Sequence, residues 1–215
     1  MKDVVVAAGV SVALAACACG CAAEPVGDWT FEVLLDGKPI GEHRFTVTSE
    51  GDRTLVSSRA RFEVKLLGFT AYRYRHEADE VWRNGCLEKV RARTDDDGEA
   101  LRVDADPGEG GGLKVTSTRG SASYPGCVMG FGYWNPAILK QQRLLNVQTG
   151  EYVAVVVTSL PDQAVLAGGR TVPAKRWKLS GPENPLEFWY GVADERWLAL
   201  ESTVSGGRKL RYRLR

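Results

Sequence analysis

A run of alternating residues between Val56 and Leu66 is the feature that most constrains the fold. Apolar or small residues occupy every second position of this run, and polar or charged residues lie between them. Successive side chains of a β-strand point to opposite faces, whereas a helix would place Arg59 on the same face as Phe62 and Leu66. The run therefore predicts a long antiparallel strand with one dry face and one solvated face.

Similar runs fill most of the chain and are separated by turn signals. Asp36-Gly37, Asn84-Gly85 and Asp97-Gly98 are dipeptides typical of tight hairpins. One short helix is expected over residues 135–146, because Asn135 is a good N-cap and Pro136 suits the first helical position. The fold class predicted is mainly all-β: an antiparallel up-and-down meander of about a dozen strands, curled into a barrel or half-barrel that leaves few free edges.

The N-terminal segment indicates export. An apolar run from Val4 to Ala16 ends in Leu14-Ala15-Ala16-Cys17, a pattern that resembles a bacterial lipobox. Cleavage before Cys17 would leave this cysteine lipidated and the protein anchored to a membrane, facing the periplasm. The absence of Asp at position 18 favours the outer membrane. The run is shorter than the roughly 20 residues of a spanning helix.

A second cleavage site remains open after Ala23, where an ordinary signal peptidase would release a soluble periplasmic protein. The expected organisation is a lipoprotein signal peptide over residues 1–16, a flexible tether over 17–27 and a single antiparallel β domain over 28–215. About 199 residues would follow the leader, which a single domain can accommodate.

The charge balance argues against nucleic acid as a partner. The formal net charge is +1, so no broad positive field is expected. The basic run from Arg208 to Arg215 alternates with apolar residues, which predicts a final strand with a solvated cationic face.

The cysteines of the domain predict one disulfide. Only Cys86 and Cys127 lie beyond the leader region, and an even pair in an exported protein is most simply a bridge. The pair lacks a C-x-x-C spacing, which disfavours a redox role. The cluster at Cys17, Cys19 and Cys21 has no histidine nearby, so no metal and no cofactor are expected.

No residue is assigned a catalytic role. His43 and His76 are the only histidines, and His43 shares a face with apolar neighbours, which favours a core histidine with a satisfied hydrogen bond. A hydrolase would need one of them within hydrogen-bond reach of a nucleophile in a cleft, and the nucleophile-elbow motif G-x-S-x-G does not occur in this sequence. A pair of glycosidase carboxylates among Glu77, Asp79 and Glu80 is disfavoured, because Glu77 and Asp79 share one face of the strand and Glu80 lies on the other.

The aromatic residues suggest a ligand. Tyr133 and Trp134 precede the expected helix in a glycine-rich segment, which would either close over a barrel mouth or plug it. The first hypothesis is an envelope lipoprotein that binds or carries an apolar or amphipathic ligand. The alternative is a structural or interaction protein of an envelope complex that has no small ligand. The residues expected to line a ligand site are Phe62, Val64, Leu66, Tyr72, Tyr74, His76, Tyr133 and Trp134.

Two groups of motifs resemble a known family. Tyr72-Arg73-Tyr74-Arg75-His76 leads into a segment from Glu80 to Leu87, and Tyr133-Trp134-Asn135-Pro136 is followed by a segment from Leu144 to Gly150. Together they resemble a bacterial envelope family catalogued as domain of unknown function 6134, over most of the chain after Trp29. That resemblance implies no activity and no catalytic residue. The expected architecture is also similar to that of open-barrel periplasmic carriers, a comparison of fold alone.

Overall fold

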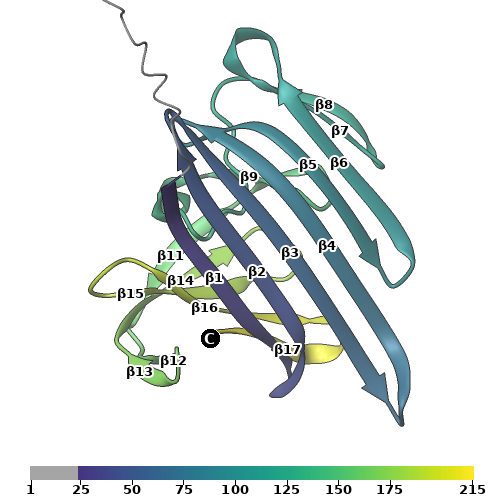
Figure 1. Ribbon diagram of the computed structural model, residues 1–215, viewed down its shortest axis with the longest axis vertical. Coiled ribbons are helices and arrows are strands. Elements are labelled where there is room, and N and C mark those ends of the chain that lie inside the picture. Colours follow the sequence, from purple (N-terminus) through teal and green to yellow (C-terminus); the bar gives the residue numbers. More distant parts are fainter. Residues whose placement is uncertain (1–23) are drawn as a thin grey trace, which may run out of the picture.

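The computed structural model describes residues 24–215 of the chain. Thirteen of its strands form one antiparallel sheet, in the order β11-β14-β15-β16-β17-β1-β2-β3-β4-β5-β6-β7-β8. The end strands β11 and β8 pair only with β14 and β7 and not with each other, so the sheet is open. In Figure 1 the C-terminal strands cross behind the N-terminal ones at a steep angle, so the sheet curls into a half-barrel, as the sequence predicts.

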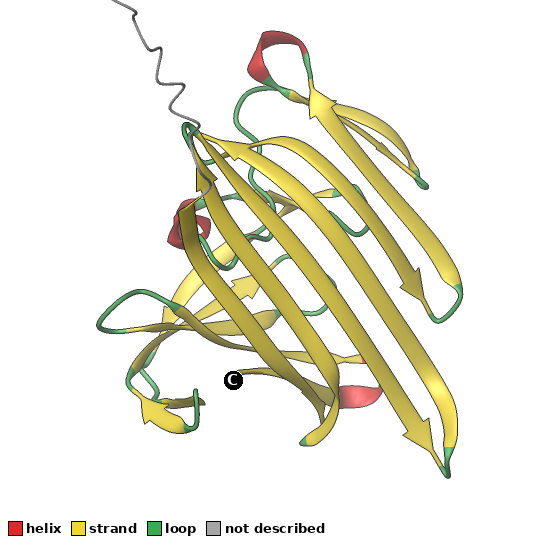
Figure 2. Ribbon diagram, viewed as in Figure 1, coloured by secondary structure: helices red, strands yellow, loops and turns green. Residues whose placement is uncertain are grey.

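The strand bounds follow the chain in order. They are β1 (Glu24–Leu35), β2 (Lys38–Glu50), β3 (Arg53–Leu66), β4 (Phe69–Arg83), β5 (Cys86–Asp96), β6 (Glu99–Pro107), β7 (Leu113–Ser117), β8 (Gly120–Tyr124), β9 (Arg143–Leu145), β10 (Tyr152–Ala154), β11 (Val156–Leu160), β12 (Val165–Ala167), β13 (Arg170–Val172), β14 (Ala174–Ser180), β15 (Leu186–Gly191), β16 (Trp197–Val204) and β17 (Arg208–Leu214). Figure 2 shows how little of the described chain is helical: three short 3-10 turns, over Glu109–Gly111, Pro136–Lys140 and Ser205–Gly207.

The long N-terminal strands are joined by two-residue turns. Asp36-Gly37, Asn84-Gly85 and Asp97-Gly98 have positive φ at both positions, the backbone that matches the twist of a hairpin. The turn between β3 and β4 has the same conformation at Leu67-Gly68, where φ is 50° and 85°. Leu67 at this tip is 91% exposed.

The C-terminal basic run forms β17, as predicted. This strand pairs with β1 on one side and with β16 on the other, and it joins the two halves of the sheet. Lys209, Arg211 and Arg213 lie on the convex face, where Arg211 pairs with Glu201 and Arg213 with Glu32. Tyr212 and Leu214 point to the concave side, where they join the apolar core.

The concave face of the half-barrel is filled by the segment between β8 and β11. Val128, Met129, Ile138, Leu144 and Leu145 of this segment are almost fully buried. They pack against the inward residues of the sheet, among which Phe31, Trp82, Phe188 and Trp197 are the largest with little or no exposure.

The predicted disulfide is present between Cys86 and Cys127, 41 residues apart. It ties the first residue of β5 to the filling segment. A 2.8 Å backbone hydrogen bond from Leu87 to the carbonyl of Val128 also fastens this segment to β5, and one of the same length from Leu145 to the carbonyl of Met129 joins two parts of the segment.

Two predicted boundaries are wrong. The helix expected over residues 135–146 ends at Lys140, since Leu144 and Leu145 form β9 and pair with β10. Its predicted cap is correct, because Asn135 Oδ1 accepts a hydrogen bond from the Ala137 amide at 3.0 Å. The tether expected over residues 17–27 overlaps β1, whose residues from Glu24 onward already pair with β2. The lipobox at Cys17 and the two cleavage sites lie outside the described residues.

Candidate functional site

A cavity of about 310 Å³ lies on the concave face, between the sheet and the filling segment. Residues from both halves of the sheet line it. They are His43 and Phe45 of β2, Tyr74 and His76 of β4, Phe131, Tyr133, Asn146, Val147 and Gln148 of the filling segment, Pro182, Leu186 of β15, Trp197, Leu200, Ser202 and Val204 of β16, and Leu210 and Tyr212 of β17.

The two histidines meet in this cavity across a small residue. His43 is the register partner of Ala60 on β3, and Ala60 is in turn the partner of His76 on β4. A methyl side chain between them leaves room for the imidazole rings, whose centroids are 6.5 Å apart at a steep angle. The pair exists because β2, β3 and β4 are aligned at this one position.

Hydroxyl groups hold both rings. His43 Nε2 lies 2.7 Å from Ser58 Oγ and His43 Nδ1 lies 3.3 Å from the Tyr212 hydroxyl. His76 Nδ1 lies 2.8 Å from Thr94 Oγ1, on the adjacent strand β5. His43 is therefore a hydrogen-bonded histidine of the interior, as its apolar surroundings in the sequence indicate.

Burial keeps these rings neutral. Loss of solvent lowers the pKa of His43 well below its usual value, and the nearby His76 lowers it further. Burial, together with the charge of Arg59, lowers the pKa of His76 to about 4. Burial also raises the pKa of Tyr74 and of Tyr212 above the usual value for tyrosine. At neutral pH these four side chains are uncharged hydrogen-bonding groups.

We call His43, His76, Tyr74, Tyr212 and Gln148 the polar wall of the cavity. Gln148 belongs to it because its Oε1 accepts a hydrogen bond from the Tyr74 hydroxyl at 3.1 Å. The rest of the lining is mostly aromatic or aliphatic. Trp197 lies among these aromatic rings, with centroids 5.2 Å from those of Phe45 and Tyr133.

The segment around Tyr133 and Trp134 is tightly packed beside the cavity. A Cβ atom on Gly132 would lie 3.0 Å from Nε1 of Trp134 and 3.4 Å from the ring of Trp82, so this glycine permits a close approach of the backbone. The Tyr190 hydroxyl donates to the carbonyl of Tyr133 at 2.7 Å. These contacts favour a plug over a mobile lid.

The structure brings three of the eight expected ligand residues to the cavity: Tyr74, His76 and Tyr133. Phe62 does not line the cavity but packs against a residue that does: its ring is stacked on that of Tyr74, with the centroids 5.1 Å apart. Trp134 packs edge-on against Trp82 instead.

The remaining three lie nearer the β3–β4 tip. Val64 is the register partner of Tyr72, whose hydroxyl donates to Asp96 rather than to the cavity. Leu66 is 65% exposed at the hairpin end, beyond the bulge that follows Val64. These three residues do not line this cavity, because the strand extends past the end of the core.

Sequence reasoning missed the C-terminal contributors. Tyr212 lies in the basic run, whose alternation marks it as inward-facing, and that alternation could have identified it. Trp197 and Gln148 have no such local signal, because their place depends on how the two halves of the sheet come together.

The three carboxylates considered for glycosidase chemistry are divided between the two faces of the sheet, as expected. Glu77 and Asp79 are exposed on the convex face, where Asp79 accepts two hydrogen bonds from Arg59. Glu80 faces inward and accepts a 2.7 Å hydrogen bond from Trp82 Nε1. Burial raises the pKa of Glu80 to about 7. Within residues 24–215 no group of three or more His, Cys, Asp or Glu side chains is placed to hold a metal ion.

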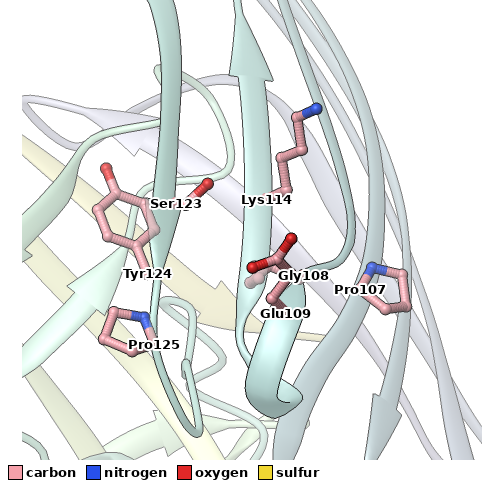
Figure 3. A pocket seen from close by; sticks show the side chains of 8 residues that line it. Pro107, Gly108, Glu109, Lys114, Ser123, Tyr124 and Pro125 are labelled. Atoms are coloured by element: carbon pink, nitrogen blue, oxygen red, sulfur yellow. The ribbon is translucent and has the colours of Figure 1, made fainter.

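A larger cavity of about 690 Å³ lies at the end of β6, β7 and β8 (Figure 3). Glu109 and Lys114 border one side of it, and Ser123, Tyr124 and Pro125 border the other. Its walls come only from this local hairpin region, and it contains neither histidine. The concave cavity is the better candidate, because separate parts of the chain converge on it.

Comparisons with known proteins agree with this fold. The family described as "Domain of unknown function (DUF6134)" matches residues 31–215. The crystal structure of a β-barrel-like protein of domain of unknown function DUF1849 from Brucella abortus is similar, with a TM-score of 0.60 and 13% sequence identity. The match covers 90% of this chain and 98% of that one. The comparison with curated proteins finds no match. Among residues 24–215, no helix has the length and apolar character needed to cross a bilayer.

Proposed function

We propose that this chain, which belongs to the DUF6134 family, binds an apolar or amphipathic small molecule in the concave cavity. The observation that carries the proposal is the convergence of β2, β4, β15, β16, β17 and the filling segment on one aromatic-lined space. Its volume of about 310 Å³ falls at the lower end of the range for ligand sites.

The cavity is preformed by the packing that surrounds it. The filling segment is fixed by a disulfide and by backbone hydrogen bonds, so a ligand would not have to order it. Aromatic rings supply apolar contact area with little loss of rotamer freedom on binding. These features support a binding role.

Native mass spectrometry of the folded domain tests the proposal. We expect an apolar adduct that is retained in the folded protein and released on denaturation. The variant Leu186→Trp should reduce the adduct, because Leu186 lines the cavity and a larger ring would fill it. Leu139→Trp is the matched control, since Leu139 is also partly buried but lies outside the cavity. Equal adducts in both variants, or none in repeated preparations of the wild type, would contradict the proposal.

We also propose that the protein is exported and held at a membrane by lipid on Cys17. The sequence pattern before Cys17 and the disulfide of the domain support this location. Labelling of cells with a radioactive fatty acid should tag the wild type, and Cys17→Ser should remove the tag. An untagged wild type that begins after Ala23 would support the soluble periplasmic form instead.

A further inference from the structure

The cavity walls carry no fixed charge. Asp, Glu, Lys and Arg make up 26% of the sequence, yet none of them is among the described residues that line the concave cavity. Arg59 is the cation whose charge lowers the pKa of His76, but its guanidinium lies on the convex face. There it donates hydrogen bonds to Asp79 and to the carbonyls of Ser58 and Ala78. The described lining therefore offers no opposite charge to an ionised group.

The polar wall nevertheless retains hydrogen-bonding capacity. His76 uses Nδ1 for Thr94, and its Nε2 has no protein partner among the described residues. The Thr94 hydroxyl can donate or accept, so the free Nε2 can present a proton or a lone pair. Gln148 accepts from Tyr74 through Oε1, which leaves its amide N–H groups as donors.

The free-energy cost of entering this cavity differs between an ion and a neutral polar group. An ionised carboxylate or ammonium loses its hydration on entering an apolar site, and without an opposite charge that loss is not recovered. A hydroxyl or carbonyl loses far less hydration free energy. The hydrogen bonds that it made to water can be replaced by hydrogen bonds to the polar wall.

We infer that the ligand is an uncharged amphiphile, with an apolar or aromatic body and a hydroxyl or carbonyl end that hydrogen-bonds to the polar wall. The cavity discriminates against an anionic or cationic end of the same length. This inference rests on the proposed binding function and specifies the chemistry of its ligand.

Three probes of equal chain length, decanol, decanoate and decylamine, test this inference. Their binding is measured by tryptophan fluorescence at pH 7.5. Trp197 lines the cavity, and Leu186→Trp serves as the filled control. We expect decanol to bind at least tenfold more tightly than either ion. Decanoate or decylamine binding as tightly as decanol would overturn the inference while leaving the binding function intact. Failure of all three, with no adduct in native mass spectrometry, would overturn the binding function itself.

Three variants distinguish hydrogen bonding by the polar wall from general packing in the cavity. His76→Phe should reduce decanol affinity about fivefold or more and leave decane binding nearly unchanged, whereas His76→Gln should retain most of the decanol affinity. Gln148→Lys places a cation at the cavity and should raise decanoate affinity at least tenfold. Circular dichroism checks that each variant is folded. An unchanged preference in both His76→Phe and Gln148→Lys would contradict the role of the polar wall.

Discussion

His43 Nε2 and Ser58 Oγ lie 2.7 Å apart on neighbouring strands, a contact that a serine hydrolase would also make. The surroundings differ from those of a hydrolase. The other ring nitrogen of His43 faces the neutral hydroxyl of Tyr212 rather than a carboxylate, and Ser58 is 4% exposed and absent from the cavity lining. The pair satisfies the hydrogen-bonding groups of the interior.

Ser58→Ala is therefore expected to affect stability. Removing the hydroxyl leaves a partly buried His43 nitrogen without its partner, which should lower the free energy of unfolding by about 1 kcal/mol. Urea denaturation measures this change. A fluorophosphonate probe should leave Ser58 unlabelled, and a stoichiometric adduct on Ser58 would instead establish it as a nucleophile.

Glu80 predicts an unusual dependence of stability on pH. Its pKa is near 4.5 in the unfolded chain and about 7 in the folded protein, so only the folded state holds the proton between these values. Its contribution to the free energy of unfolding, about 3 kcal/mol, is fully present below pH 4.5 and is lost as pH rises to about 7. Gln does not titrate, so the Glu80→Gln variant does not share this loss. The free energy of unfolding of the variant minus that of the wild type should therefore increase as pH rises and become constant above pH 7.

The control for this titration is Glu77→Gln, on the same strand but exposed on the convex face. The difference in the free energy of unfolding between this variant and the wild type should stay nearly constant across the same pH range. Titration of His43 and His76 is common to all three proteins and cancels in the differences. A flat difference for Glu80→Gln would show that folding does not raise the pKa of Glu80.

The disulfide predicts a large loss of stability on reduction. In the chain-entropy model, a loop closed by residues 41 apart contributes about 3–4 kcal/mol. The double variant Cys86→Ser, Cys127→Ser should lose this amount in urea denaturation, and the reduced wild type should match it. Reduction should also weaken ligand binding, because the bridge fastens the segment that supplies Phe131 and Tyr133. A reduced protein as stable as the oxidised one would contradict the entropic account.

The β3–β4 turn predicts a stabilising substitution. Leu67 has a φ of 50° and is 91% exposed, so it adopts a left-handed backbone that suits Asn or Asp better than Leu. Leu67→Asn should raise the free energy of unfolding by about 1 kcal/mol. Asn84→Leu, at the equivalent position of the β4–β5 turn where φ is also 50°, should lower it by a similar amount. Thermal unfolding of both variants tests the pair, and changes of the same sign would contradict it.

The fold could be predicted to the extent that its signals are local. Alternation and Asp-Gly or Asn-Gly turns revealed the long hairpins, because strand faces and turn backbones are set by adjacent residues. The Leu67-Gly68 turn lacks the polar first residue of that pattern and gave no comparable signal. The helix after Asn135 was overestimated, because pairing with β10 draws Leu144 and Leu145 into a strand.

The candidate site was harder to predict than the fold. Tyr74 and His76 share a face of one strand, and this could be inferred from spacing. The meeting of His43 with His76 depends on the register of three strands around Ala60, and the contact with Tyr212 joins residues 169 apart. No pattern within one strand reveals such distances, so the uncharged lining of the cavity becomes visible only in the folded molecule.

The pairing of β1 with β17 has a consequence for the order of folding. Strands β1 to β8 can form successive hairpins as soon as each is available, since every neighbour is local. The remaining edge of β1 finds its partner only when the last strand has emerged, as Phe31 pairs with Leu214. Closing so long a loop is slow and leaves that edge open to wrong partners in the meantime. A chain built this way acquires its cavity in the final step of folding, and a truncated or stalled chain would lack it.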